Sequence, residues 1–134
     1  MNGNQLRRKL KGVKVCGLDQ LPKKGGGYVI ANTEPSYMRG SHWVCLYTPR
    51  RGMPEYFDSS GNMPLPQMEV YLTRYAPKYK KNTRRVQDYG TDTCGEFCVY
   101  YVKKRREGWS FKKIMDSFSE DLLFNEVLVS LYID

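Results

Sequence analysis

The chain has 134 residues, 40% of them hydrophobic and 27% charged, and a formal net charge of +8 at pH 7. This length and composition predict one globular domain, residues 1–134, and exclude a disordered chain. No apolar run is long enough to span a membrane, and the start MNGNQLRRKLKG lacks the apolar core of a secretory signal. The four cysteines show no compact disulfide spacing. We therefore expect reduced thiols, an intracellular location and no membrane partner.

The first half of the chain predicts a basic start followed by strands. Residues 4–11 predict a short basic helix or arm, and residues 13–21 a connecting segment that buries its aliphatic side chains. The continuous apolar run at 28–32 is typical of a central strand. Residues 42–48 and 55–58 predict two further strands, and the short turn between them indicates an antiparallel hairpin.

The second half predicts mainly helices. Helical spacing of apolar residues covers 65–75, 94–106 and 110–118, and residues 84–87 predict a fourth strand. Ser119 is expected to cap a last helix over 120–133, whose apolar residues stand at 123, 124, 127, 128 and 131. The expected fold is α+β, with a small mixed or antiparallel sheet packed by helices.

Cys94 stands where a polar, Gly-containing loop meets the helix predicted over 94–106. A thiol at a helix start lies at the positive end of the macrodipole, a position that favours the nucleophilic thiolate. The unpaired N–H groups of Cys94 and Gly95, with the side-chain amide of Gln87, are candidate donors to an oxyanion. The alternative is a cysteine that only fills the core, since Cys is among the most often buried residues.

His42 is the only histidine, so a Cys–His site in this chain must use it. A base of this kind needs a third group to orient its ring. Asp58 ends the strand that follows His42's strand, and an antiparallel hairpin places these ends side by side. Ser59, Ser60 and Glu55 are alternative orienting residues. Otherwise His42 is a half-exposed strand residue and Asp58 a turn-initiating one.

The ordered set His42-Trp43-Val44, Tyr56-Phe57-Asp58-Ser59, Gln87 and Cys94-Gly95-Glu96-Phe97-Cys98 resembles the adenain/Ulp1-like cysteine protease clan, over about residues 12–106. Ala31-Asn32-Thr33 and the absence of Asp before Cys94 are similar to its adenoviral branch. The resemblance implies a papain-like or Ulp1-like fold with the nucleophile at the start of the central helix. The chain is shorter than clan members, and we expect it to lack their extended C-terminal region.

Carried over to these positions, the resemblance implies Cys94 as nucleophile, His42 as general base and acid, Asp58 as orienting residue and Gln87 as oxyanion donor. Trp43 would flank the substrate. The implied activity is an endopeptidase cleaving next to small, Gly-containing sites. Its substrates would include viral structural precursors in a virus or virus-like element, which places it in the host nucleus, cytoplasm or virion. No cofactor is required, although a peptide or DNA activator is implied by the adenoviral relatives.

Other functions remain open. A SUMO- or ubiquitin-like deconjugase and an acyltransferase would use the same triad. Zinc binding is disfavoured because only Cys94 and Cys98 are paired in spacing. A basic nucleic-acid-binding module without catalysis is the remaining alternative. A monomer is favoured for either function. The candidate residues of the binding module lie in a basic, tyrosine-containing segment, which otherwise is a solvated loop: Arg74, Lys78, Lys80, Lys81, Arg84 and Arg85.

Overall fold

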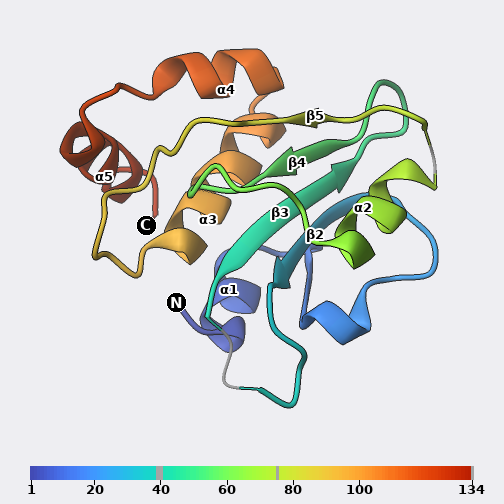
Figure 1. Cartoon of the computed structure of the whole chain (residues 1–134). Helices are drawn as coiled ribbons and strands as arrows, with labels where there is room; N and C mark the ends of the chain where they lie inside the picture. The colour runs from blue at the N-terminus through green and yellow to red at the C-terminus, as the bar shows by residue number, and fades with distance from the viewer. Residues whose placement is uncertain (39–40, 75, 134) are drawn as a thin grey trace.

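The computed structural model describes residues 1–38, 41–74 and 76–133, and it has the expected α+β architecture (Figure 1). Its elements in chain order are α1 (Gly3–Lys9), β1 (Lys14–Cys16), the 3₁₀-helix η1 (Leu18–Gln20), β2 (Gly27–Asn32), β3 (Trp43–Thr48), β4 (Glu55–Phe57), α2 (Pro66–Thr73), β5 (Lys80–Lys81), α3 (Cys94–Arg106), α4 (Phe111–Ser117) and α5 (Leu122–Ser130). Within the described ranges, no helix is both long and apolar enough to cross a membrane.

The strands form one mixed sheet in the order β1-β2-β3-β4-β5. The inner pairs β2–β3 and β3–β4 are antiparallel, whereas β1 and β5 join the edges in parallel orientation. The expected hairpin of residues 42–48 and 55–58 is therefore confirmed, with Cys45 opposite Phe57. The apolar run at 28–32 forms the inner strand β2, as predicted.

Helices cover both faces of the sheet, and alternate strand residues point into two cores. Ile30, Cys45 and Phe57 face the core that contains α3. On this side α1, α4 and α5 pack around α3, with Leu6, Leu10, Phe111, Ile114, Phe118 and Val129 all buried. Ala31, Leu46 and Tyr56 face the opposite core, which α2 closes with Met68, Tyr71 and Leu72. Helix α3 is thus central, buried between the sheet and the outer helices.

Two expectations for the chain's local structure were wrong. Residues 14–16 form strand β1 within the segment expected only to connect, because they pair with Val29–Ala31 of β2. Residues 84–87 are not a strand, although the N–H groups of Val86 and Gln87 both donate to the Ser59 carbonyl. The strand that pairs with the outer edge of β4 is instead β5, where Lys80 and Lys81 lie opposite Glu55 and Tyr56.

The last helix also differs from its prediction. Asp121, not Ser119, is its N-cap, with its carboxylate accepting from the N–H groups of Leu123 and Phe124. The residues that α5 buries are Asn125 and Val129. The expected apolar face instead points largely outward, with Leu123, Phe124, Val127 and Leu131 exposed. The polar Asn125 is buried because its amide donates to the carbonyls of Val86 and Ser119.

Candidate active site

The hairpin of β3 and β4 places His42 and Asp58 side by side at one end of the sheet. His42 comes directly before β3 and Asp58 directly after β4. Because the strands are antiparallel, these two positions meet, and His42 Nε2 lies 2.6 Å from Asp58 Oδ1. This contact leaves Nδ1 of the imidazole free to face another partner.

Cys94, the first residue of α3, lies close to this ring. The backbone N–H of Trp43, the residue after His42, donates to Cys94 Sγ over 3.3 Å, and Cys94 is one of the two residues that raise the pKa of His42. The three side chains are graded in exposure: the His42 side chain is 21% exposed, Cys94 is 7% exposed and the Asp58 side chain 3%. The arrangement is a buried carboxylate bonded to a partly exposed imidazole, with a nearly buried thiol close by.

The imidazole is held in its charged form. Burial by itself lowers the pKa of His42, but hydrogen bonds and negative charge from Asp58 and Cys94 outweigh it and raise the pKa to about 9. His42 is therefore cationic at neutral pH. A cation placed against a sulfur atom stabilises negative charge that develops there, as an acyl-transfer nucleophile requires.

Further hydrogen bonds hold Asp58 in place beside His42. Its Oδ1 also accepts from the backbone N–H of Ser60, over 2.8 Å. Asn82, the residue after β5, bonds the Asp58 main chain: its side chain accepts from the Asp58 N–H over 3.0 Å and donates to the Asp58 carbonyl over 2.6 Å. Among the candidate orienting groups, Glu55 is bound elsewhere, to Tyr101 and Arg105.

At the start of α3, the first backbone N–H groups have no hydrogen-bond partner among residues 1–38, 41–74 and 76–133. The first intrahelical N–H bond in this turn is that of Phe97 to the Thr93 carbonyl, 3.0 Å long. The N–H groups of Cys94 and Gly95 come before it, and Thr93 offers them no side-chain cap. Backbone N–H donors at a helix N-terminus can stabilise negative charge that develops on a substrate oxygen.

Gln87 lies in the same network, but its amide is occupied. Its Oε1 accepts from the Ser59 hydroxyl over 2.6 Å, and its Nε2 donates to the carbonyl and the hydroxyl of Thr91, each over 3.0 Å. The side chain is therefore held rigidly between the Asp58–Ser60 turn and the loop before Cys94. Donation to an oxyanion would require Nε2 to exchange one of the Thr91 contacts.

Trp43 takes a positioning role in this structure. Besides the contact of its backbone with Cys94, its indole Nε1 donates to the Met1 carbonyl over 2.9 Å. The ring lies over the start of α3, where a Cβ added to Gly95 would come within 3.5 Å of it. Trp43 is half-buried, so part of the ring borders the surface next to the thiol.

Sequence patterns gave no sign of the residues that hold the loop before Cys94. Glu126 of α5 accepts from the Thr93 hydroxyl over 2.8 Å and from the Asp88 N–H over 2.9 Å. Its carboxylate thus ties α5 to the loop that presents the nucleophile. A glutamate on an outer helix has no local pattern that would indicate such a role, because its partners lie more than thirty residues away.

The other three cysteines are held as thiols. Burial raises the pKa of Cys16, Cys45 and Cys98, and all three lie inside the protein. Among residues 1–38, 41–74 and 76–133, no three His, Cys, Asp or Glu side chains are grouped in a way that could hold a metal ion.

The structure separates the six basic residues expected to bind nucleic acid. Arg84 donates to the carbonyls of Met115 and Phe118, and Arg85 donates to the Gln87 carbonyl while its guanidinium covers the ring of Tyr89. These two arginines therefore brace the loops around the site. Arg74, Lys78 and Lys80 are exposed and Lys81 is half-buried, on the α2–β5 side of the molecule.

The fold is similar to that of a viral protease. The structure aligns with two crystal structures of the ASFV pS273R protease, with TM-scores of 0.58 and 0.53 and sequence identities of 21% and 20%. These alignments cover 80% and 79% of this chain.

A protein similar in sequence is also named as a protease. A protein of Acanthamoeba polyphaga mimivirus named as a thiol protease is 27% identical over 132 residues, which cover 86% of this chain. The chain spans 43% of that relative and 44% and 42% of the two ASFV chains, less than half of each. No family model matches the sequence. The resemblance to the adenain/Ulp1-like clan inferred from the sequence is thereby confirmed at the level of fold and class.

Proposed function

We propose that this chain is a cysteine protease domain in which Cys94 attacks a scissile carbonyl. His42 protonates the leaving amine and then activates the water that releases the acyl-enzyme, while Asp58 keeps its ring oriented. The observation that carries the proposal is the placement of the only histidine: Asp58 lies 2.6 Å from its ring, and the Cys94 sulfur lies 3.3 Å from the backbone nitrogen of the next residue, Trp43.

The oxyanion would be bound first by the N–H groups of Cys94 and Gly95, which precede the hydrogen-bond ladder of α3. Gln87 would add a donor when its amide gives up the Thr91 hydroxyl. Trp43 would border the substrate at the thiol.

The substrate class follows from resemblance to the clan. We expect cleavage of proteins beside small, Gly-containing sites, in the maturation of viral or virus-like structural precursors. The viral origin of the similar proteases supports this choice over a SUMO- or ubiquitin-like deconjugase. An acyltransferase would use the same three residues and differ only in the acceptor of the acyl group.

The test is thiol labelling at about pH 6 with iodoacetamide, followed by intact mass, in wild type, Cys94→Ala, His42→Ala and Cys16→Ala. One fast adduct is expected in wild type and in Cys16→Ala, the matched control with a buried thiol. The adduct should be lost in Cys94→Ala and strongly slowed in His42→Ala. Equal, slow labelling of all thiols in wild type would contradict the proposal.

A second measurement separates the substrate classes. Gly-containing linear peptides and ubiquitin-like fusion proteins are compared as substrates at equal enzyme concentration, with Cys94→Ala as the blank. Preferential cleavage of the peptides supports an endopeptidase, and preferential cleavage of the fusions identifies a deconjugase.

A further inference from the structure

The end of the sheet opposite the thiol carries a second surface of different character. Strand β3 begins beside His42 and ends at Thr48, and six strand residues separate its ends by about 20 Å at the usual rise. Three segments far apart in the sequence meet there: the loop before β2, the β3–β4 turn and the chain between α2 and β5.

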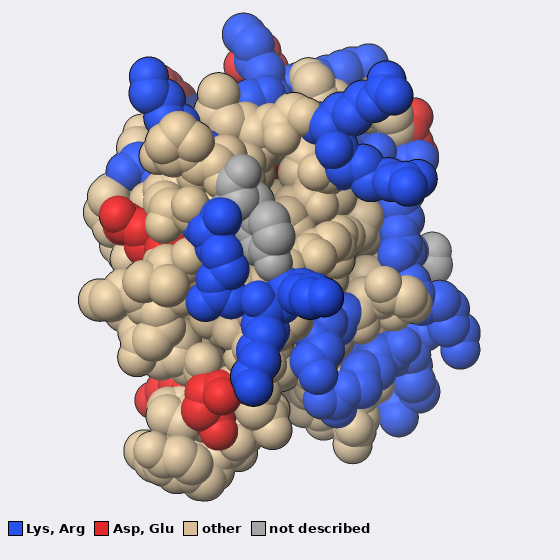
Figure 2. All heavy atoms as spheres, turned by 90° about the vertical axis from the view of Figure 1, so that its right-hand side faces the viewer, with Lys and Arg blue, Asp and Glu red and all other residues tan. Residues whose placement is uncertain are grey.

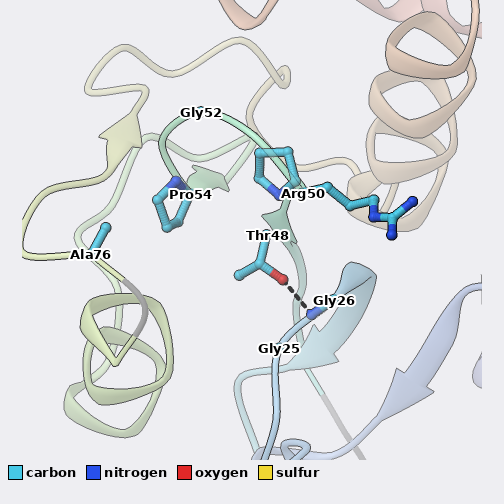
Figure 3. A pocket seen from close by; sticks show the side chains of 8 residues that line it. Gly25, Gly26, Thr48, Arg50, Gly52, Pro54 and Ala76 are labelled. Carbon is cyan, nitrogen blue, oxygen red and sulfur yellow. Dashed lines mark hydrogen bonds between the residues drawn. The ribbon is translucent and has the colours of Figure 1, made fainter.

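A pocket of 410 Å³ lies between these segments, lined by Gly25, Gly26, Thr48, Pro49, Arg50, Gly52, Pro54 and Ala76 (Figure 3). The Gly26 N–H donates to the Thr48 hydroxyl over 2.6 Å, which fastens the glycine loop to the end of β3. The Arg74 guanidinium donates to the Lys23 carbonyl and fastens the same loop to the end of α2. These contacts hold the pocket walls together.

Exposed cations lie within or next to the three segments that form this pocket. We define the far-end basic surface as the seven exposed residues Lys23, Lys24, Arg50, Arg51, Arg74, Lys78 and Lys80. The three segments that carry them, 20–28, 48–54 and 74–80, contain no Asp or Glu. Figure 2 shows Lys and Arg side chains gathered over this face, with the acidic side chains toward the margins of the view. Within the described part of the chain, none of the seven forms a salt bridge.

The chemistry of the pockets on this surface indicates what they would bind. The walls of the glycine-lined pocket are Gly, Pro, Thr, Ala and Arg, with no large apolar side chain to receive one from a peptide. A neighbouring hollow is lined by Tyr47, Pro49, Arg50, Arg51 and Arg105. The Tyr47 ring is already stacked on Tyr28, at a centroid distance of 4.1 Å, and it carries Arg105 5.1 Å from its centroid. Its faces are therefore not open to a base.

We propose that the far-end basic surface binds nucleic acid through its phosphates, without reading bases. Cations with no acidic partners, set around a pocket of small residues, suit a repeated phosphate charge better than an acidic peptide with apolar side chains. The surface lies at the opposite end of β3 from Cys94, so bound nucleic acid leaves the thiol accessible. Arg84 and Arg85 are not part of it, because both are bound to backbone carbonyls beside the catalytic site.

The test measures binding of a fluorescently labelled mixed-sequence DNA duplex to wild type, Arg50→Gln/Arg51→Gln and Lys112→Gln/Lys113→Gln. The last variant is the matched control, since it removes two exposed charges from α4, away from this surface. Binding is measured between about 50 and 200 mM salt, where each lost phosphate contact flattens the logarithmic salt dependence by about 0.9.

We expect Arg50→Gln/Arg51→Gln to weaken binding about tenfold or more and to flatten the salt slope by about 2, with the control changing affinity less than about twofold. Thiol labelling of Cys94 should be the same in all three proteins. An equal loss of DNA affinity in both variants would mean that binding depends only on the net charge of the protein, which would contradict the proposed site. Absence of binding by wild type, or tighter binding of poly-glutamate than of the duplex, would overturn nucleic acid as the partner.

Discussion

Two buried carboxylates stand at the two ends of the short segment Glu55–Asp58, and each has a basic partner. Glu55 accepts from the Tyr101 hydroxyl and from two nitrogens of Arg105, over 3.1 and 3.0 Å. Asp58 accepts from His42, over 2.6 Å, and from one backbone N–H. Both pairs are ionic, and both join the hairpin to other parts of the chain.

The partners decide what each pair can do. The Arg105 guanidinium keeps its proton at any working pH, and its pKa is raised further by Glu55 although burial opposes the shift. The imidazole of His42 can gain and lose a proton, and its pKa responds to the nearby Cys94 as well as to Asp58. The Glu55 pair therefore has only a structural function, whereas the Asp58 pair can take part in proton transfer.

The largest expected effect separates these two carboxylates by catalysis. If the proposed activity holds, Asp58→Asn should lower kcat by about 10³- to 10⁴-fold, because the imidazole loses its orienting acceptor and the charge that stabilises its cation. Glu55→Gln should leave kcat within about threefold for the folded fraction, since Glu55 touches neither His42 nor Cys94. Peptide hydrolysis normalised to folded protein measures both. Similar losses in the two variants would remove the distinction.

The reverse contrast is expected in stability. Arg105→Ala should lower the free energy of unfolding by about 3 kcal/mol, because it leaves the buried Glu55 carboxylate without its ion partner. Lys112→Ala is the control, since its ion pair with Asp116 is exposed and should contribute less than about 0.5 kcal/mol. Urea unfolding followed by circular dichroism measures both. If both variants lose equally little unfolding free energy, water must solvate the Glu55 carboxylate in place of Arg105.

Gly61, whose N–H donates to the Asp58 carbonyl, tests how tightly the turn after β4 is packed. Gly61 has φ +74°, and a Cβ there would meet the backbone of Arg84 and Arg85 at 2.8 Å. Gly90 has a similar φ, +77°, with nothing within 4 Å of an added Cβ.

Replacing Gly90 by Ala should cost about 1 kcal/mol of unfolding free energy, from backbone strain alone. Gly61→Ala should cost about 1–2 kcal/mol more, because the 84–87 segment must shift. Thermal unfolding of the two variants gives the difference. An equal cost would show that this contact relaxes freely.

The smallest effect is a pH dependence that only the Asp58 pair should have. His42 has a folded pKa of about 9, above its ordinary value of 6.5. Its contribution to stability is therefore fully present below pH 6.5 and is lost as pH rises through about 9. Activity that needs the imidazolium should fall about tenfold per pH unit above this pKa.

Asp58→Asn should lower the His42 pKa and move both changes to lower pH. Arg105→Ala should leave the pH range of both changes where it is, although the protein is less stable. Unfolding and hydrolysis measured between about pH 6 and 10 would separate these outcomes. An unmoved profile in Asp58→Asn would mean that Asp58 does not set the charge of His42.

The sequence predicted those features that depend on neighbouring residues. Cys94 begins α3 because a polar loop is followed by an apolar helical stretch, and His42 meets Asp58 because a short turn makes their strands antiparallel. The inner strands and the long helices were predicted for the same reason, since their patterns of apolar residues are local.

Other features could be decided only by the tertiary structure. Strands β1 and β5 have three and two residues, too few for a pattern, and they exist because a longer neighbour pairs with them. The same holds for α5, which buries Asn125 rather than its leucines because that amide donates to the carbonyl of the distant Val86 as well as to that of Ser119.

The two proposed functional surfaces show the same division. Sequence order alone indicated the His, Asp and Cys of the candidate catalytic site, but not Asn82 and Glu126, which position its loops. The basic residues at 74–85 form a run in the sequence. In the fold, Arg84 and Arg85 bond to backbone carbonyls, whereas Arg74, Lys78 and Lys80 belong to the same exposed surface as Lys23 and Arg50. Local patterns are fixed by nearest neighbours along the chain, whereas long-range hydrogen bonds and surface charge depend on which segments the sheet brings together.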